Sequence, residues 1–392
     1  MWYASGTMTT TTFDSHAASR EYFNRPADEE FRDLDNLISE TKRRRDRSEV
    51  KELDLCGATI REAGETSPIR FAGYPLTPWA FSQLCARLSA PADFVRQLNP
   101  DTIQRVLRER QARRAGEEKE APMVRALITE PPFGGQPEIR AILTPRYERV
   151  WDIDLFSRVK RTVGDILKPA GTIAGRGSAD GGAGQGGQWS AGVRERSGIY
   201  SSDRNTFAFM VNPTPLPGPD GGDQLLYRGT IIGNSETGER KCFAWFFAFD
   251  SICANHIIWG ASEKIQTVAF RHIGKKSVDR GVLEIERILE TWAAVQPEEE
   301  LDKILMASKT PFYDRNKPDE RERKLRAKGF PVHLIDASDT HAEQREKTHG
   351  TDRSTYWGVV CGITRAAQEL PHAGERLDIE SWAGEMLQEC KV

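Results

Sequence analysis

The chain has 392 residues, a formal net charge of −3 at pH 7 and a hydrophobic content of 38%. This length accommodates two average domains, and the apolar content suffices for a core, which excludes a wholly disordered chain. A nearly neutral charge excludes a global attraction to nucleic acid, so any polyanion site must be a local basic patch.

The composition also predicts the compartment. No apolar run in the sequence approaches the roughly 20 residues that a membrane helix needs. The six cysteines are scattered without C-x-x-C pairs, mostly in apolar contexts. This pattern favours buried thiols in a reducing compartment over a disulfide framework, and it predicts a cytoplasmic protein without a membrane segment.

The first quarter of the chain predicts a tail followed by helices. Met1–Phe13 lacks the charge-then-apolar order of a signal peptide, and residues 1–24 are expected to be a disordered tail. Residues 25–120 are predicted to be mainly helical, with strand-like pieces between helices. A helix is expected over Pro26–Arg47, where apolar residues recur at helical spacing. Another begins after Thr77, a good N-cap, with Pro78 as its first residue.

Residues 121–296 predict a core of sheet and helix. The strand Lys241–Phe249 is apolar on both faces, which suits only the middle of a covered sheet. It follows the polar turn Asn234–Gly238, where we expect Glu236 to be a turn residue and Gly238 to adopt a left-handed conformation. Further elements are a hairpin of Met123–Ile128 and Ile139–Leu143, a helix over Asp152–Leu167, strands over Thr206–Val211, Leu225–Ile232 and Ile265–Phe270, and a helix around residues 282–292.

A glycine-rich segment, residues 171–198, interrupts this core. Such a run builds no core of its own, so the alternatives are a mobile loop and a ligand-contacting lid. No Lys stands in the G-K-[ST] position, which excludes a Walker loop. The segment carries Arg176, Trp189 and Arg194, and single-strand binders combine positive charge with aromatic rings in this way.

Residues 297–392 predict a helical C-terminal region, with helices over Glu298–Ala307 and Arg321–Lys328 and at the C-terminal end. The fold class is therefore α+β: a central antiparallel sheet covered by helices, with a glycine-rich insertion and a helical C-terminal region.

Basic residues gather in several runs. Those at Lys42–Arg47 and Arg321–Lys328 lie among acids, which predicts solvated helix faces. The run Arg271–Arg280 has only Asp279 as internal compensation and lies between the covered sheet and a helix. We predict phosphate contacts there, with Arg146 assisting and Tyr147 or Trp189 as a stacking surface. The residues predicted for phosphate contact at this run are Arg271, His272, Lys275, Lys276 and Arg280.

A series of motifs carries a resemblance to a known family. These are R-P-A-D-E-E-F-R-D-L at Arg25–Leu34, L-T-P-W-A-F-S-Q-L-C at Leu76–Cys85, L-T-P-R-Y-E-R-V at Leu143–Val150, N-S-E-T-G at Asn234–Gly238, I-C-x-N-x-I-I-x-G at Ile252–Gly260, R-H-x-G at Arg271–Gly274 and Y-W-G-V-V-C-G-I-T-R-A-A-Q at Tyr356–Gln368. In this order they resemble the family catalogued as domain of unknown function 932, found on prophages, plasmids and bacterial chromosomes. The resemblance implies a phage or mobile-element protein with no agreed catalytic residues.

The expected function is binding of single-stranded DNA without a covalent step, in phage or plasmid recombination. The β-β-β-α order from Thr206 to Trp292 is similar to that of ring-forming single-strand annealing proteins, whose sheet and helix line a basic groove. This likeness implies strand annealing by a homo-oligomer, and it rests on fold alone.

Two alternatives stay open. The first is a non-enzymatic, oligomeric interaction factor of a mobile element. The second is a metal-dependent enzyme that acts on nucleic acid through Asp152, Asp154 and Glu236. No cofactor is expected, and no zinc site, because no second ligand pair accompanies Cys253 and His256.

Overall fold

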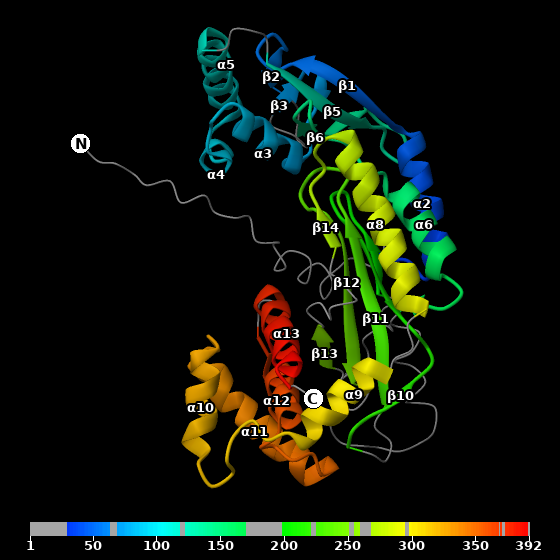
Figure 1. The fold of residues 1–392 in the computed structure, drawn as a ribbon. Helices are drawn as coiled ribbons and strands as arrows, with labels where there is room; N and C mark the ends of the chain where they lie inside the picture. The colour runs from blue at the N-terminus through cyan, green and yellow to red at the C-terminus, as the bar shows by residue number, and fades with distance from the viewer. Residues whose placement is uncertain are drawn as a thin grey trace, which may run out of the picture.

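The computed structural model describes residues 30–62, 69–117, 122–169, 198–220, 225–250, 255–258, 268–294, 298–367, 369–370 and 373–390. The predictions for the N-terminal tail and for nearly all of the glycine-rich segment lie outside these residues. The described chain forms an N-terminal unit, a large antiparallel sheet with three helices on it, and a group of C-terminal helices (Figure 1). The predicted α+β class is confirmed.

The N-terminal unit combines two small sheets with three helices. One sheet has the order β1-β5-β6, from β1 (Ser48–Asp54), β5 (Met123–Thr129) and β6 (Glu138–Leu143). The other has the order β2-β3-β4, from β2 (Ile60–Glu62), β3 (Ile69–Phe71) and β4 (Tyr74–Pro75). The helices are α3 (Pro78–Arg87), α4 (Ala92–Val95) and α5 (Pro100–Glu117).

The structure agrees with some of the features that the sequence predicts for this unit and differs in others. The predicted N-cap is confirmed, since the Thr77 hydroxyl accepts the Ala80 N–H at 3.2 Å, and so is the β5–β6 hairpin. Strand β1 pairs with β5 across residue 120, where the sequence predicts a boundary between two regions. The described part of residues 25–120 also contains four strands. The sequence of β1, S-E-V-K-E-L-D, lacks the apolar alternation that marks a strand, because β1 is a solvated edge strand.

The large sheet is antiparallel and has the order β13-β12-β11-β9-β7, with β14 paired to β12, β10 to β11 and β8 to β9. Its strands are β7 (Lys168–Pro169), β8 (Ile199–Ser201), β9 (Thr206–Val211), β10 (Leu216–Pro217), β11 (Leu225–Asn234), β12 (Cys242–Asp250), β13 (Asn255–Ile258) and β14 (Val268–Phe270). Strand β12 is buried on both faces: Cys242 and Phe246 face the helices, and Phe243 and Phe247 the opposite side. The prediction of a covered central strand is confirmed.

Three helices cover one face of this sheet: α2 (Leu34–Asp46), α6 (Asp152–Val163) and α8 (Lys275–Ala294) (Figure 1). Their apolar stripes meet the sheet through fully buried side chains such as Leu37, Phe156 and Leu289. Each such side chain contributes roughly 1.5–3 kcal/mol through burial. Helix α2 begins at Leu34 with Asp33 as its N-cap, and so starts later than the sequence predicts.

Two glycines of β11 make room for aromatic rings on the opposite face. A Cβ at Gly229 would lie 2.3 Å from the Phe247 ring, and one at Gly233 would lie 2.3 Å from the Phe243 ring. The rings therefore lie across the neighbouring strand where a side chain would otherwise stand, and the chain needs glycine at both positions.

The C-terminal helices pack around a helix that is buried almost throughout, α12 (Tyr356–Ala367). The others are α9 (Glu298–Lys309), α10 (Pro318–Ala327), α11 (Val332–His349) and α13 (Ala373–Gln388). Leu226 and Ala248 of the large sheet join their core. The sequence predicts every one of these helices except α11, whose polar sequence gives only a weak apolar stripe.

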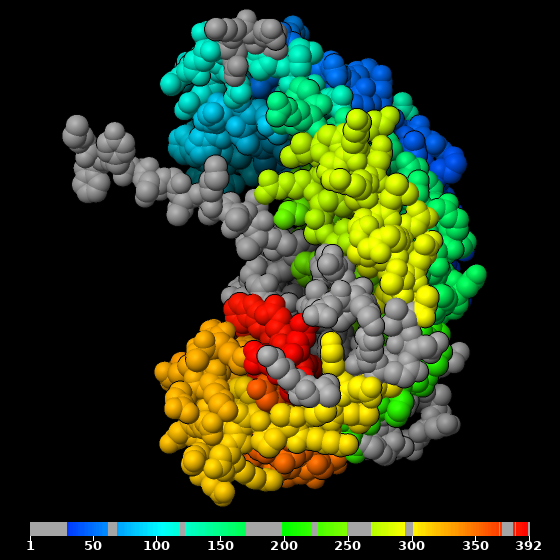
Figure 2. Space-filling view, in the orientation of Figure 1, coloured from blue at the N-terminus to red at the C-terminus, as the bar shows by residue number. Residues whose placement is uncertain are grey.

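The three parts follow a C-shaped course (Figure 2). The N-terminal unit forms the upper arm, the large sheet with α8 the back, and the C-terminal helices the lower arm (Figure 1). No described helix has the length and apolar character needed to span a membrane.

Candidate nucleic-acid interface

Two segments far apart in sequence meet at the start of α8. One is the loop between β6 and α6, and the other is the loop between β14 and α8. Tyr147 and Ile273 form an antiparallel bridge. The Gly274 N–H donates to the Arg146 carbonyl at 3.2 Å, and the Glu148 N–H donates to the His272 carbonyl at 3.0 Å. The fold thereby brings the backbone of Arg146 against the loop that leads into the basic first turn of α8.

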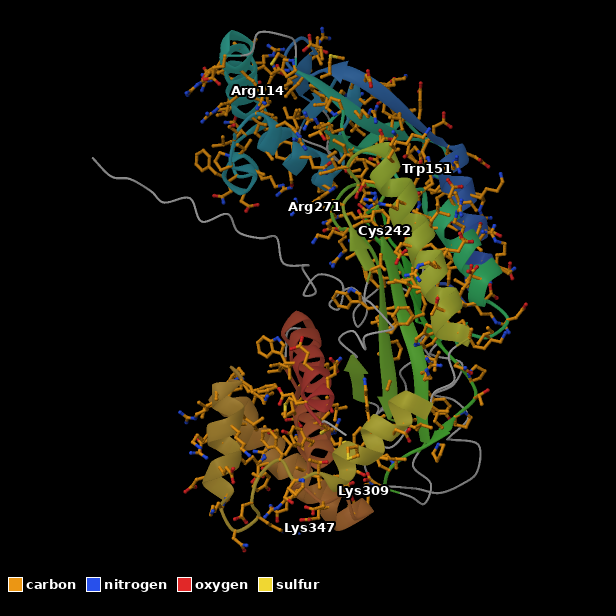
Figure 3. The ribbon with its side chains drawn as sticks, viewed as in Figure 1. Arg114, Trp151, Cys242, Arg271, Lys309 and Lys347 are labelled. Atoms are coloured by element: carbon orange, nitrogen blue, oxygen red, sulfur yellow. The ribbon has the colours of Figure 1, made fainter. Side chains whose placement is uncertain are left out.

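Five exposed cations gather there, and we call them the basic cluster: Arg146, Arg271, Lys275, Lys276 and Arg280. None of the five forms an ion pair with another residue that the structure describes. The first turn of α8 contains no acidic residue, although Asp279 follows in the next turn. The positive end of the helix dipole adds to the field of these side chains. Figure 3 shows Arg271 on the inner side of the C, below the N-terminal unit.

One of the predicted contact residues, His272, lies beneath this surface, and a second, Tyr147, is half-buried. The His272 side chain is buried, with 3% of the residue exposed, and burial lowers its pKa to about 4. Its Nδ1 lies 3.3 Å from the Glu148 carbonyl. A carbonyl oxygen only accepts, so Nδ1 donates in this contact. His272 is therefore neutral at pH 7, and its predicted phosphate contact is wrong.

Tyr147 serves as a support for the basic loop. Its ring stacks on His272 with centroids 5.0 Å apart and planes 16° apart, and the Arg149 guanidinium lies 5.8 Å from its centroid. Its hydroxyl donates to the Ser235 carbonyl at 2.7 Å, and burial raises its pKa. These contacts engage one face of the ring and the hydroxyl. Tyr147 is half-buried, and the stacking of a base on it stays a prediction.

Three further predicted residues, Arg176, Trp189 and Arg194, lie outside the described residues. In the basic runs that the sequence assigns to solvated helix faces, most cations have partners, although Arg323 has no ion pair among the described residues. On α2, Arg43 bonds Glu40 and Arg45 bonds Asp154. On α10, Lys324 pairs with Glu320, whereas Arg321 is buried and bonds Ser338. The basic cluster differs from these runs in its lack of pairing.

Behind the basic cluster, the turn Asn234–Gly238 is enclosed by the protein. Ser235 and Thr237 are fully buried, and Gly238 has the predicted left-handed conformation with φ +77°. From α3, Trp79 Nε1 and Gln83 Nε2 donate to the Thr237 carbonyl at 3.2 and 2.8 Å. The turn therefore joins the N-terminal unit to the large sheet, and we call it the junction turn.

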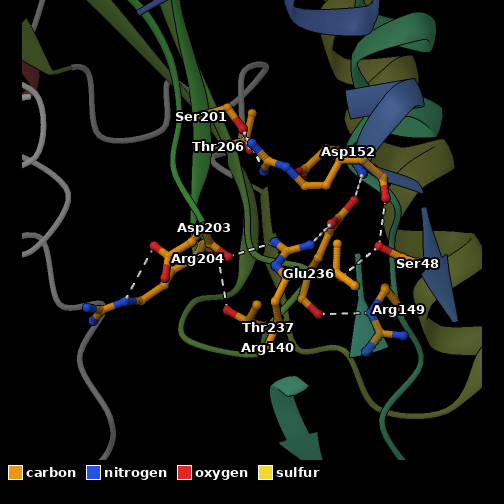
Figure 4. A network of polar contacts seen from close by, with 12 residues as sticks. Ser48, Arg140, Arg149, Asp152, Ser201, Asp203, Arg204, Thr206, Glu236 and Thr237 are labelled. Atoms are coloured by element: carbon orange, nitrogen blue, oxygen red, sulfur yellow. Dashed lines mark hydrogen bonds and ion pairs between the residues drawn. The ribbon is translucent and has the colours of Figure 1, made fainter. Parts of the chain in front are cut away.

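A buried carboxyl pair, Asp152 and Glu236, lies at this junction (Figure 4). Glu236 Oε1 accepts the backbone N–H of Asp152 at 3.0 Å, and its Oε2 lies 3.5 Å from Arg140 Nη1. Asp152 accepts from Asn234 Nδ2 at 2.7 Å and from the Thr206 hydroxyl at 2.6 Å. Burial and the neighbouring Glu236 charge raise the pKa of Asp152 from 3.8 to about 7.

The predicted alternative of a metal-dependent site is not favoured by this geometry. Asp152 and Glu236 do lie together, but protein donors occupy their oxygens. Asp154 points elsewhere and pairs with Arg45 at 2.7 Å. Among the described residues, no group of three or more His, Cys, Asp or Glu side chains is placed to hold a metal ion.

Two neighbours of this pair were not predicted from the sequence: Arg140, which lies against Glu236 Oε2, and Arg149, whose Nε donates to the Glu236 main-chain carbonyl at 2.9 Å. Arg140 lies in a strand that reads E-I-R-A-I-L, where a single basic residue suggests a solvated position. One signal was present: N-S-E-T-G is uninterruptedly polar directly before a covered strand. Such a turn is either solvated or held by a polar network, and the structure shows the second case.

No family model matches the chain, and neither the curated proteins nor the solved structures contain a match. The resemblance to the domain of unknown function 932 family therefore stays a prediction. The candidate function rests on the geometry of the basic cluster.

Proposed function

We propose that the protein binds single-stranded DNA through the basic cluster and catalyses no covalent step. The observation that carries this proposal is the convergence of five exposed cations, without described ion-pair partners, at the start of α8. Two segments distant in sequence supply them. The chain has a net charge of −3, so it has enough carboxylates to pair with its cations. A basic group that remains without an ion-pair partner among the described residues is therefore suited to bind an external anion.

The physical basis is counterion release. Each phosphate that a cation neutralises lowers the slope of log K against log salt by roughly 0.7 for a single strand. Five contacts would give a slope of about −3.5. Binding of this kind is measurable at low salt and weakens steeply as salt is added.

The order of the β-strands and helices supports single-stranded DNA as the ligand. Strands β9, β11 and β12 are antiparallel neighbours, and α8 follows and packs on their helix-covered face. This is the arrangement expected from the likeness to annealing proteins, and it supports the proposal by analogy of fold. Strand annealing, a homo-oligomer and a mobile-element origin belong to the same proposal. Cys85, Cys242 and Cys390 are buried thiols outside any disulfide, which supports a reducing, cytoplasmic compartment.

The test is binding of a fluorescently labelled single-stranded oligonucleotide to the wild-type chain and to Lys275→Ala/Lys276→Ala. A matched control is Lys42→Ala/Arg43→Ala, which also removes two positive charges, both of them paired on α2. We expect the first variant to lose most of its affinity and the control to keep it. Absence of wild-type binding at low salt, or equal losses in both variants, would overturn the proposal.

A second candidate is a protein-binding factor without nucleic acid as ligand. Ile273 and Leu283 are more than half exposed, and they lie beside and along the basic cluster. Exposed apolar side chains next to arginine are common at protein interfaces. Sedimentation of Ile273→Ser/Leu283→Ser tests this candidate: loss of self-association in the variant, together with no oligonucleotide binding by the wild type at low salt, would favour it for this surface.

A further inference from the structure

The carboxyl pair Asp152–Glu236 ties several elements together at one buried point. Asp152 begins α6 and Glu236 belongs to the junction turn. Arg140 comes from β6 of the N-terminal unit, and Thr206 begins β9 of the large sheet. Asp152 is 2% exposed and Glu236 is 1% exposed. Two adjacent carboxyl groups in such a place cannot both be charged without a large cost.

Charged and titratable groups face the pair from every neighbouring element. Arg44 faces it from α2, Arg140 from β6, and Tyr147 and Arg149 from the loop before α6. Asp203 reaches the same network through Arg140, and Cys242 faces Asp152 from β12.

Several of these neighbours keep one charge state around neutral pH. Burial raises the pKa of Cys242 and that of Tyr147, so both stay neutral. Burial lowers the pKa of Arg140 to about 10, so it stays positive. Asp152 is different, because its pKa of about 7 lies within the neutral range. The carboxyl pair therefore gains or loses its proton at pH values at which these neighbours keep the same charge.

We propose that the Asp152–Glu236 pair makes the junction between the N-terminal unit and the large sheet pH-sensitive, closed most firmly when the pair holds a proton. When that proton leaves, a second negative charge remains in a buried site. The contacts that join the units converge on the same turn, from Trp79 and Gln83 of α3 and from Arg140 of β6. Loss of the proton therefore favours opening at the place where the two units are joined.

The linkage between proton binding and closure of the junction gives the direction of the pH dependence. The folded pKa of Asp152 lies above the value of 3.8 for an exposed group, so the closed junction binds a proton that the open junction releases. Closure is therefore fully favoured below about pH 4, weakens as pH rises from about 4 to about 7, and is flat above that. One proton changes the opening equilibrium by up to about tenfold for each pH unit within that window.

Hydrogen exchange of the full chain at pH 5.5 and pH 7.5, corrected for the intrinsic exchange rate, tests this proposal. Reporter amides are those of Ile142, which donates to Gln83 Oε1, and Glu239, which donates to the Ser235 hydroxyl. We expect their protection to fall more than tenfold from pH 5.5 to 7.5 in the wild type and to stay constant in Asp152→Asn. Amides of α12, in the separate C-terminal core, serve as the internal control.

Equal loss of protection in the wild type and in Asp152→Asn would overturn the proposal, as would constant protection in the wild type. If Asp152→Asn does not fold, Glu236→Gln takes its place. The wild type alone also gives a test: its Tm should fall between pH 5.5 and 7.5, and a rising Tm would contradict the proposal. None of these readouts depends on nucleic acid, so they are independent of the proposed function.

Discussion

The molecule has two concentrations of charge, and they are opposite in kind. At the junction turn, Asp152, Glu236 and Arg140 are buried and bonded to one another or to neighbouring polar groups. At the start of α8, the side chains of the basic cluster stand in solvent without described ion-pair partners. The two regions are physically connected, because Tyr147 bonds the junction turn and supports the basic loop.

This difference distinguishes charged groups that stabilise the fold from charged groups that are available to bind a ligand. Buried charges that are bonded on every side stabilise one arrangement of the chain, and removal of one partner leaves the other uncompensated. Exposed charges without partners add little to stability and are free to attract an external anion. Changes at the junction should therefore alter stability, and changes at the basic cluster should alter binding.

The largest expected effect is at Arg140. Arg140→Met keeps much of the side-chain volume but leaves the buried Glu236 carboxylate without its cation, which should lower the free energy of unfolding by roughly 3–5 kcal/mol. Denaturant unfolding measures it. The control Arg43→Met, at an exposed ion pair on α2, should cost less than about 1 kcal/mol. A similar loss in the free energy of unfolding for both variants would contradict the distinction between the two regions.

A smaller effect is expected at Tyr147. Tyr147→Phe removes the hydrogen bond from its hydroxyl to the Ser235 carbonyl, and the free energy of unfolding should fall by about 1 kcal/mol. Because the ring still stacks on His272, oligonucleotide affinity should change by less than it does in Lys275→Ala/Lys276→Ala. A Tyr147→Phe variant of unchanged stability would show that this bond does not hold the loop.

The smallest change in stability is expected at the basic cluster itself. Lys275 and Lys276 are exposed and unpaired among the described residues, so Lys275→Ala/Lys276→Ala should keep its free energy of unfolding within about 0.5 kcal/mol. Alanine is also a good helix former in the first turn of α8. Thermal unfolding measures this, and a large decrease in Tm would show that these lysines stabilise the fold.

Local signals in the sequence were sufficient where one residue determines one feature. Thr77 with Pro78 identified the start of α3, and the apolar strand around Phe243 identified the centre of the large sheet. The sequence also grouped Arg146 with the Arg271 run, which the backbone contacts bring together.

Features that depend on distant partners escaped prediction. The edge strand β1 is recognisable only by its pairing with β5, and α11 is held in part by the buried bond from Arg345 to Asp220. The burial of His272 and its stacking on Tyr147 depend on the packing of two loops. Burial of Arg140 depends on Glu236, which lies far along the chain.

The most direct test of the central claim is the salt dependence of oligonucleotide binding. If Lys275 and Lys276 each neutralise one phosphate, Lys275→Ala/Lys276→Ala should flatten the slope of log K against log salt by about 1.4. Lys42→Ala/Arg43→Ala should keep the wild-type slope. Equal slopes for all three proteins, or no binding by the wild type at low salt, would contradict the claim that the basic cluster holds nucleic acid.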